Sequence, residues 1–376
     1  QTSLEHPTPD SIRITLRPGV NANAMTGFME DFVAALRQRD FDWLRSMFVE
    51  SYREIDHPTG STIDKAGTIA SLERLFRSEE PYYRVEVLAT LGDALQLGRH
   101  VFGASSASSK NFDVGAYENV RIQIDDRNEG CEVFDARHLA DAIGRLYERY
   151  AESLPEGPER NAAMAIGTFF KLGQSWDLEL FSAVIAADIE YVDNRHAGMG
   201  ELDRDSLLNA LRVMKEELTD NLQARAEDVL RILPNALLVH YSDSGTDKRS
   251  GGEFERHSWE VWVFSEQGLL RRWERFELEH RDQAIARFEE LTSEADGAPD
   301  NVLVINRSKR RIAQNTALEV MNRSGQAIVD QDWVALRACL RDDYREHHYP
   351  TGSTFGPDEH VASFQSLYRS DNPYFR

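Results

Sequence analysis

Two short segments carry the side chains best suited to proton transfer. "EIDHPTG" places Asp56 and His57 before a Pro-Thr-Gly turn, and "YVDNRH" places Asp193 two residues before Arg195. A carboxylate held in an apolar environment has its charged form destabilised, so its pKa rises and it becomes a useful general base. Asp56, His57 and Asp193 are therefore the candidate catalytic residues.

These candidates also have structural interpretations. Neighbouring strand residues point to opposite faces, so Asp56 and His57 are not expected to form one dyad. Asp56 suits a turn-capping carboxylate that accepts backbone N–H bonds before Gly60. Asp193 can pair with Arg195 on the same strand face. The sequence favours the turn role for Asp56 and leaves catalysis as the alternative.

Histidines and aromatic residues supply the candidates for lining a ligand pocket, although most such residues serve as core. The candidates are Phe32, Trp43, Tyr52, Tyr83, His100, Tyr191, Arg195, His240, Trp262 and His348. The neighbours His347 and His348 do not predict a metal site, because their side chains diverge and no third ligand has suitable spacing. The sequence also has no phosphate-cradling glycine loop or dinucleotide fingerprint. No metal and no cofactor is predicted.

The segments that hold these residues recur along the chain. "YREIDHPTGST" begins at Tyr52 and "YREHHYPTGST" at Tyr344, so the turn is kept while His348 replaces the aspartate. "FDARHLADAIGRLYER" from Phe134 likewise matches "FELEHRDQAIARFEEL" from Phe276. Repetition of this kind indicates one structural unit used several times.

Each unit is predicted to place its helices before its strands. Apolar residues at spacings of three and four, from Met25 to Leu36, predict an amphipathic first helix. Two further helices flank a short strand and the Pro-Thr-Gly turn, and alternating apolar residues then predict an antiparallel sheet. A closing helix follows. The order predicts an α+β fold with helices packed on a curved sheet.

The repeats set the predicted domain boundaries. They are a lead-in (1–19), domain one (20–152), domain two (159–293), a linker (294–302) and an incomplete domain three (303–376). Domain three is expected to hold only the helical half, because the sequence stops where its first long strand begins. The chain is therefore interpreted as a piece of a longer protein.

Composition narrows the classes of partner. A net charge of −21 disfavours nucleic acid, and "NRSKRRI" is too short to counter it. No run approaches the ~18 apolar residues of a membrane span. Two cysteines, Cys131 and Cys339, give no disulfide framework and fit a reducing cytoplasm.

Nearly the whole chain resembles the SnoaL-like branch of the nuclear-transport-factor-2-like superfamily. The markers are "NAAMA", "YVDNRHAGMGELDRDSLL" and "GGEFE", with Asn194 where a "VDHR" element would have histidine. They are similar to modules appended to large bacterial regulatory proteins. The resemblance implies a conical pocket between sheet and helices. It also implies that Asp56 matches the general-base aspartate of ketosteroid isomerases, while Phe32 stands where those enzymes have an oxyanion-stabilising tyrosine.

The leading hypothesis is a tandem ligand-binding or assembly module of a larger cytoplasmic bacterial protein, with a small apolar or amphipathic ligand. An enzyme of the cyclase or isomerase kind, using Asp56 or Asp193 as general base, is the alternative. A third hypothesis is a scaffold that self-associates through sheet faces which its helices leave uncovered. A pocket carboxylate with a hydrogen-bond donor would favour the enzyme, and an apolar cup without one would favour the binder.

Overall fold

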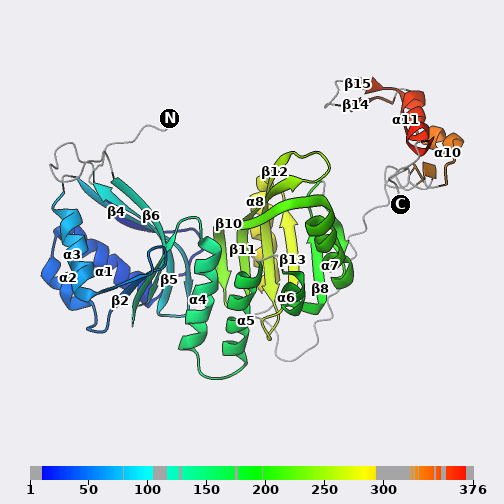
Figure 1. The fold of residues 1–376 in the computed structure, drawn as a ribbon. Helices are drawn as coiled ribbons and strands as arrows, with labels where there is room; N and C mark the ends of the chain where they lie inside the picture. Colours follow the sequence, from blue (N-terminus) through cyan, green and yellow to red (C-terminus); the bar gives the residue numbers. More distant parts are fainter. Residues whose placement is uncertain are drawn as a thin grey trace. The chain divides into compact units, whose positions relative to one another are not determined.

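The computed structural model describes residues 11–78, 80–104, 117–126, 129–173, 177–196, 198–293, 323–324, 327–328, 330–342, 344–348 and 353–369. The chain divides into two compact units, residues 1–298 and 299–376, and each is described by itself. The larger unit contains two mixed sheets with helices packed against them (Figure 1). The predicted α+β fold class is confirmed.

Module one (residues 12–153) is built on a seven-stranded sheet. In sheet order its strands are β1 (Ile12–Leu16), β4 (Pro81–Leu91), β5 (Leu95–Ala104), β6 (Tyr117–Asp126), β7 (Gly130–Asp135), β2 (Arg53–Asp56) and β3 (Ser61–Asp64). Its helices are α1 (Ala24–Gln38), α2 (Phe41–Met47), α3 (Lys65–Phe76) and α4 (Leu139–Ser153). β1 lies in the segment predicted as a lead-in, and it pairs in parallel with β4.

Polar caps set the positions of the helices that cover the first sheet. Asn23 and Thr26 form a reciprocal capping box at the start of α1. The Asn23 side-chain amide also donates to the carbonyls of Gly92 and Leu95, at 2.8 and 2.9 Å, which fixes α1 to the β4–β5 turn. Asp64 caps α3 by accepting from the Gly67 N–H.

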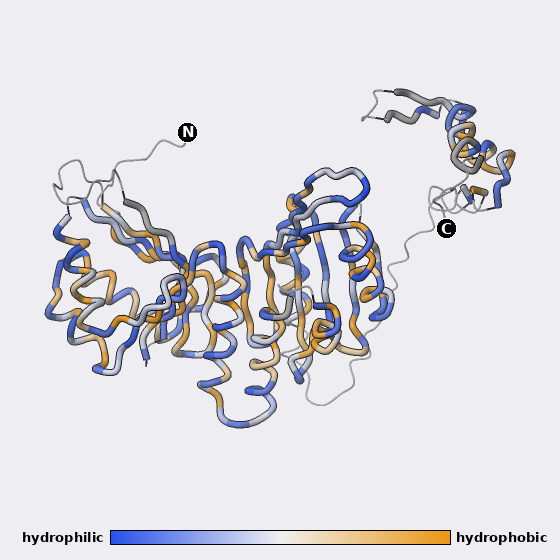
Figure 2. Tube along the Cα trace, in the orientation of Figure 1, coloured by the Kyte–Doolittle hydropathy of each residue, from blue (hydrophilic) through white to orange (hydrophobic). Residues whose placement is uncertain are grey.

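Helices cover both faces of the first sheet. α1, α2 and α3 pack on one face, against a core that includes Val85, Val87 and Val133. α4 packs on the other face, against Leu97 and Ile122 among others. Figure 2 shows hydrophobic stretches along these helices and strands. The prediction that the helices leave the outer sheet faces uncovered is wrong for this sheet, because the apolar stripe of α4 packs against it.

Module two (residues 158–293) has the same strand order without a counterpart of β1. In sheet order its strands are β10 (Thr219–Leu233), β11 (Ala236–Asp247), β12 (Glu253–Phe264), β13 (Leu270–Phe276), β8 (Ile185–Asp193) and β9 (Gly200–Leu202). Its helices are α5 (Pro158–Gly173), α6 (Leu178–Ala183), α7 (Arg204–Val213), a π-helical turn (Met214–Leu218), a 3₁₀ turn (Leu278–His280) and α8 (Arg281–Ser293). α8 covers the outer face, against Leu238 and Val261.

The two modules share one continuous core. α4 and α5 form an antiparallel hairpin between the two sheets (Figure 1). Gly144 and Gly167 lie at the crossing, where a Cβ on Gly167 would come within 3.0 Å of the Gly144 carbonyl oxygen. Arg17 bridges Glu86 of β4 and Asp228 of β10 at 2.8 and 2.7 Å. Packing and ion pairs therefore both join the modules.

The smaller unit holds α10 (Trp333–Ala338), β14 (Glu346–His348), β15 (Ser353–Phe355) and α11 (Pro357–Arg369). β14 and β15 form an antiparallel hairpin between the helices, as β2 and β3 do between α2 and α3. Leu336 and Val361 are buried together. Among the described residues, no helix has the length and apolar character needed to cross a membrane.

Candidate functional site

A cavity of about 200 Å³ lies in module one between the sheet and helices α1–α3. Its apolar lining comprises Met25, Phe28, Met29, Phe32, Met47, Phe48, Val49, Ile63, Leu72, Leu75 and Phe102. Its polar lining comprises Tyr52, Glu54, Asp56, Thr68, Ser71, Tyr83, Arg121, Gln123, Asp125 and Asp126, with Gly130 at the edge. The cavity is therefore an aromatic cup with a charged region.

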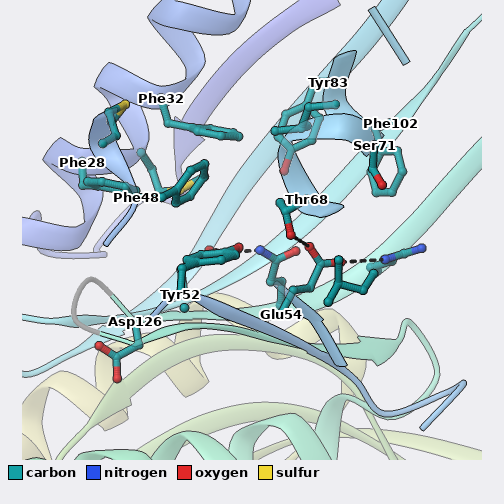
Figure 3. Close-up of a pocket in the computed structure, with 18 of the residues that line it drawn as sticks. Phe28, Phe32, Phe48, Tyr52, Glu54, Thr68, Ser71, Tyr83, Phe102 and Asp126 are labelled. Carbon is teal, nitrogen blue, oxygen red and sulfur yellow. Dashed lines mark hydrogen bonds and ion pairs between the residues drawn. The ribbon is translucent and has the colours of Figure 1, made fainter. Parts of the chain in front are cut away.

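Aromatic rings build the apolar wall. Phe32 packs edge-on against Phe48 and Tyr83, with ring centroids 6.0 and 5.8 Å apart. Tyr83 stacks on Phe102 at 5.8 Å. Figure 3 shows Phe32, Phe48 and Tyr83 grouped around the space beside Glu54. Such interlocked rings keep the wall rigid without filling the centre.

Two carboxylates of β2 and one guanidinium of β6 form the charged region. Nη1 of Arg121 lies 3.7 Å from Oε1 of Glu54 and 3.5 Å from Oδ2 of Asp56. The Thr68 hydroxyl donates to Glu54 at 3.1 Å. Burial raises the pKa of Glu54 above its usual range, and the Thr68 hydrogen bond and Arg121 offset this only in part.

A second polar group lies on β5 and β6. The Gln123 amide donates to Asp125 at 2.7 Å, and the Gln96 amide donates to the same carboxylate at 3.3 Å. His100 is fully buried, with Nδ1 3.0 Å from the Tyr83 hydroxyl and Nε2 3.3 Å from Oδ2 of Asp125. His100 thus contacts the Tyr83 hydroxyl, which lines the cavity, while its Nε2 lies near Asp125 without a hydrogen bond to it.

Gly98 makes room for this imidazole. A Cβ at residue 98 would lie 2.9 Å from Nε2 of His100 and 3.2 Å from its Cδ2. The ring cannot swing away easily, because it is enclosed on every side. A glycine two residues before His100 on the same strand face is therefore part of the site.

Tyr52 lines the cavity and contacts the buried Cys131 beside it. The Tyr52 hydroxyl lies 3.3 Å from Sγ of Cys131. Burial raises the pKa of both groups well above their usual ranges. Cys131 is therefore a neutral thiol and a poor nucleophile, while Tyr52 keeps a proton that it can donate.

The structure brings Asp56 to the cavity but also bonds it within its turn. Oδ1 accepts from the Thr59 N–H at 2.9 Å and from the Thr59 hydroxyl at 2.8 Å. Oδ2 is left facing Arg121. His57 points away: it stacks on Phe134 at 4.3 Å and contacts Glu132 at 2.8 Å on the other face of the sheet. Asp56 and His57 do not form a dyad.

Asp193 and Arg195 form a bidentate ion pair in module two, with both N–O distances 2.8 Å. Tyr191 and the Met199 N–H donate to the same carboxylate. Burial alone would raise the pKa of Asp193, but the hydrogen bonds and charge of Arg195 hold it below the usual range. A satisfied carboxylate of this kind is a weak base.

The remaining predicted residues are scattered. Phe32, Tyr52 and Tyr83 line the cavity of module one, whereas His100 does not line it but contacts Tyr83. Trp43 is 40% exposed on α2, outside the cavity. His240 contacts His257 and Trp259 on the outer face of the second sheet. The side chain of His348 lies outside the described part of the chain.

In module two the corresponding space is nearly filled. The cavity there is about 50 Å³, and Trp262 and Trp273 form much of its wall. Arg275 donates to Asp243 at 2.8 Å and to Ser258 at 3.0 Å, and its Nε lies 2.9 Å from Glu260. Both tryptophan N–H groups donate to Glu260. The interior is therefore closed by rings and by an internal ion cluster.

Strand register identifies which positions differ. Asp56 pairs with Val133, whereas Asp193 pairs with Arg275, so Val133 and Arg275 occupy matching places. The neighbouring strands give four further pairs of equivalent positions. With the residue of module one first, they are Glu54 and Tyr191, Cys131 and Trp273, Gln123 and Glu260, and Asp125 and Trp262. Larger side chains in module two thus occupy the volume that is open in module one.

Sequence reasoning missed Glu54, Arg121 and Asp125. Glu54 lies two residues before Asp56, and Arg121, Gln123 and Asp125 alternate along β6. Polar residues at a spacing of two in a strand with apolar neighbours are the signal that could have found them. Within the described residues, no group of three His, Cys, Asp or Glu side chains is placed to hold a metal ion.

Comparisons with known proteins return structures but no sequence matches. No protein-family model matches the chain, and no curated protein matches it. The BvnE pinacolase from Penicillium brevicompactum is 14% identical, with 37% of this chain and 99% of that chain covered and a TM-score of 0.28. A Delta 5-3-ketosteroid isomerase from Mycobacterium sp. is 16% identical, with coverages of 31% and 92% and a TM-score of 0.26. An epoxide hydrolase from M. tuberculosis is 16% identical, with coverages of 38% and 100% and a TM-score of 0.26.

Proposed function

We propose that module one is a small-molecule-binding module, and that the chain is the ligand-sensing or assembly part of a larger cytoplasmic bacterial protein. The observation that carries the proposal is the open cavity of module one beside the filled interior of module two. A volume of about 200 Å³ is below the roughly 300–1,000 Å³ of pockets for drug-sized ligands. We therefore expect a ligand with a single ring or its equivalent.

We further infer that both modules belong to the SnoaL-like branch and arose by tandem duplication. The shared strand order supports this. So does a recurring ion pair between the last strand and the closing helix: Glu132 with Arg145 at 2.9 Å, and Glu274 with Arg287 at 3.0 Å. Both pairs lie at matching places on matching elements.

Blocking the cavity tests the binding proposal. Ser71 lines the cavity from α3, and its neighbour Ala70 is exposed and does not line it. Ser71→Phe should place a ring in the opening, whereas Ala70→Phe adds the same ring to the outside of the helix. With para-tert-butylbenzyl alcohol as probe, calorimetry should show binding to the wild type and to Ala70→Phe, and at least about tenfold weaker binding to Ser71→Phe.

The result that contradicts the proposal is equal affinity for all three proteins, or no binding of the probe to any of them. Circular dichroism of both variants guards against misfolding. Because α3 carries both changes, a general loss of helix stability would affect the two variants alike.

A second candidate function is general-base catalysis in the same cavity. The specific observation is that Glu54, a carboxylate with a raised pKa, shares the cavity with the hydroxyls of Tyr52 and Tyr83, which can donate hydrogen bonds. A small β,γ-unsaturated ketone in deuterated water is a suitable probe. Glu54→Gln should slow proton exchange beside the carbonyl by about 10²-fold or more if Glu54 is the base. Exchange no faster than in buffer, with the wild type, rules this function out for that class of substrate.

A further inference from the structure

The cavity of module one holds more negative than positive charge. Glu54, Asp56 and Asp125 line it, and Arg121 is the one Lys or Arg among its described lining residues. Asp126 also lines the cavity, but it is paired outside it with Arg149 at 2.6 Å. Three carboxyl groups therefore share one guanidinium, and the enclosed imidazole of His100 lies near Asp125.

Neutral hydrogen bonds do not balance this charge. Thr68 donates to Glu54, Thr59 donates to Asp56, and two glutamine amides donate to Asp125. These bonds orient the carboxylates but leave their charge in place. A buried charge is costly unless an opposite charge accompanies it, so this lining favours a cationic ligand.

The aromatic wall suits the same kind of ligand. Phe32, Phe48 and Tyr83 present rings to the cavity, and the faces of such rings attract cations. The cavity already contains one contact of this type, because the guanidinium of Arg121 lies 5.2 Å from the ring centroid of Phe102.

In module two, an arginine of the chain itself pairs with the buried carboxylates. Arg275 lies where module one has Val133, and its guanidinium meets Asp243 and Glu260 and lies 5.9 Å from the ring of Trp273. In module one Val133 stands at the matching place, and Gln123 and Phe102 stand where module two has Glu260 and Asp243. The carboxylates of the module-one cavity are instead Glu54, Asp56 and Asp125, and Arg121 is the one guanidinium among its described lining residues.

We propose that module one binds a ligand that carries an ammonium or guanidinium group on an apolar body, with the cation among Glu54, Asp56 and Asp125 and the apolar part against Phe32, Phe48 and Tyr83. This inference rests on the proposed binding function and names the chemical class of its ligand.

A matched pair of probes tests the charge separately from the shape. Para-tert-butylbenzyl alcohol is neutral, and para-(hydroxymethyl)phenyltrimethylammonium has the same shape with a charged nitrogen in place of one carbon. The cation is expected to bind the full-length protein about tenfold or more tightly than the alcohol. Glu54→Gln should remove most of that preference, measured as the ratio of the two affinities on the same variant.

Glu30→Gln is the matched control, since it removes the same charge from an exposed position on α1 outside the cavity. It should leave the preference intact. If the alcohol binds as tightly as the cation, the ligand class is wrong and the binding function stands. If neither probe binds, the proposed function fails as well. If Glu54→Gln does not fold, the comparison of the two probes on the wild type still decides the inference.

Discussion

Modules one and two have the same strand order, but module one encloses an open cavity and the interior of module two is nearly filled. In module one Glu54, Cys131 and Val133 leave an open space that carboxylates and rings surround. In module two the matching residues are Tyr191, Trp273 and Arg275, and that space is nearly closed. The helices and the sheet are compatible with either state. A few side chains on three neighbouring strands therefore decide whether this fold has a cavity, while the backbone does not.

The largest expected effect comes from breaking the ion cluster of module two. Arg275→Met removes the cation but keeps the length of the side chain, and leaves Asp243 and Glu260 buried without it. The variant should lose about 3–5 kcal/mol of unfolding free energy in urea. Arg271→Met is the control, because Arg271 is exposed on the same strand with one contact at 3.5 Å to Asp188; it should cost less than about 1 kcal/mol. Equal losses would mean that the cluster does not hold module two together.

An intermediate effect is expected at Gly98, whose matching residue in module two is Val239. Gly98→Ala brings a methyl group against the enclosed His100 ring and should cost about 1–3 kcal/mol in urea denaturation. In a His100→Ala background the added methyl has room, so the same change should cost clearly less. Additive losses in the double variant would show that the close approach does not constrain module one.

The smallest effect is the pH dependence that Glu54 gives to module one. Burial raises the pKa of Glu54 in the folded state, so its contribution to stability is present at low pH and is lost as pH rises from 4.5 through the raised pKa. The groups facing it are Tyr52, Asp56, Thr68, Tyr83, Arg121, Asp125 and Cys131. Glu54→Gln lacks this loss, so its stability relative to the wild type should increase with pH over that window.

Urea denaturation at several pH values from about 4 to 8 measures that difference. Glu30→Gln, at an exposed position on α1, provides the baseline. If the difference in unfolding free energy between Glu54→Gln and the wild type does not change with pH, the charge of Glu54 is already neutralised by its neighbours. Module one would then resemble module two, whose buried carboxylates are paired with Arg275.

The sequence predicted the helices and strands better than it predicted which side chains line the cavity. Amphipathic spacing identified α1 and α4, and the Pro-Thr-Gly turn pointed to Asp56, which is among the residues that line the cavity. Glu54 was not predicted, although it lies two residues before Asp56 on the same strand face. β1 was missed because its pairing with β4 depends on a strand far along the chain. Cavity volume depends on which distant side chains meet, and no single segment of sequence records that.

The close crossing of Gly144 and Gly167 has a consequence for how the protein is made. α4 leaves the ribosome before α5, and its apolar stripe has no second partner until the first helix of module two emerges. Nascent chains with such exposed stripes attract chaperones and aggregate readily. We therefore expect the packing of α4 to be completed only when module two begins to fold, and a protein cut between Ser153 and Pro158 to accumulate in insoluble form although it contains the whole cavity.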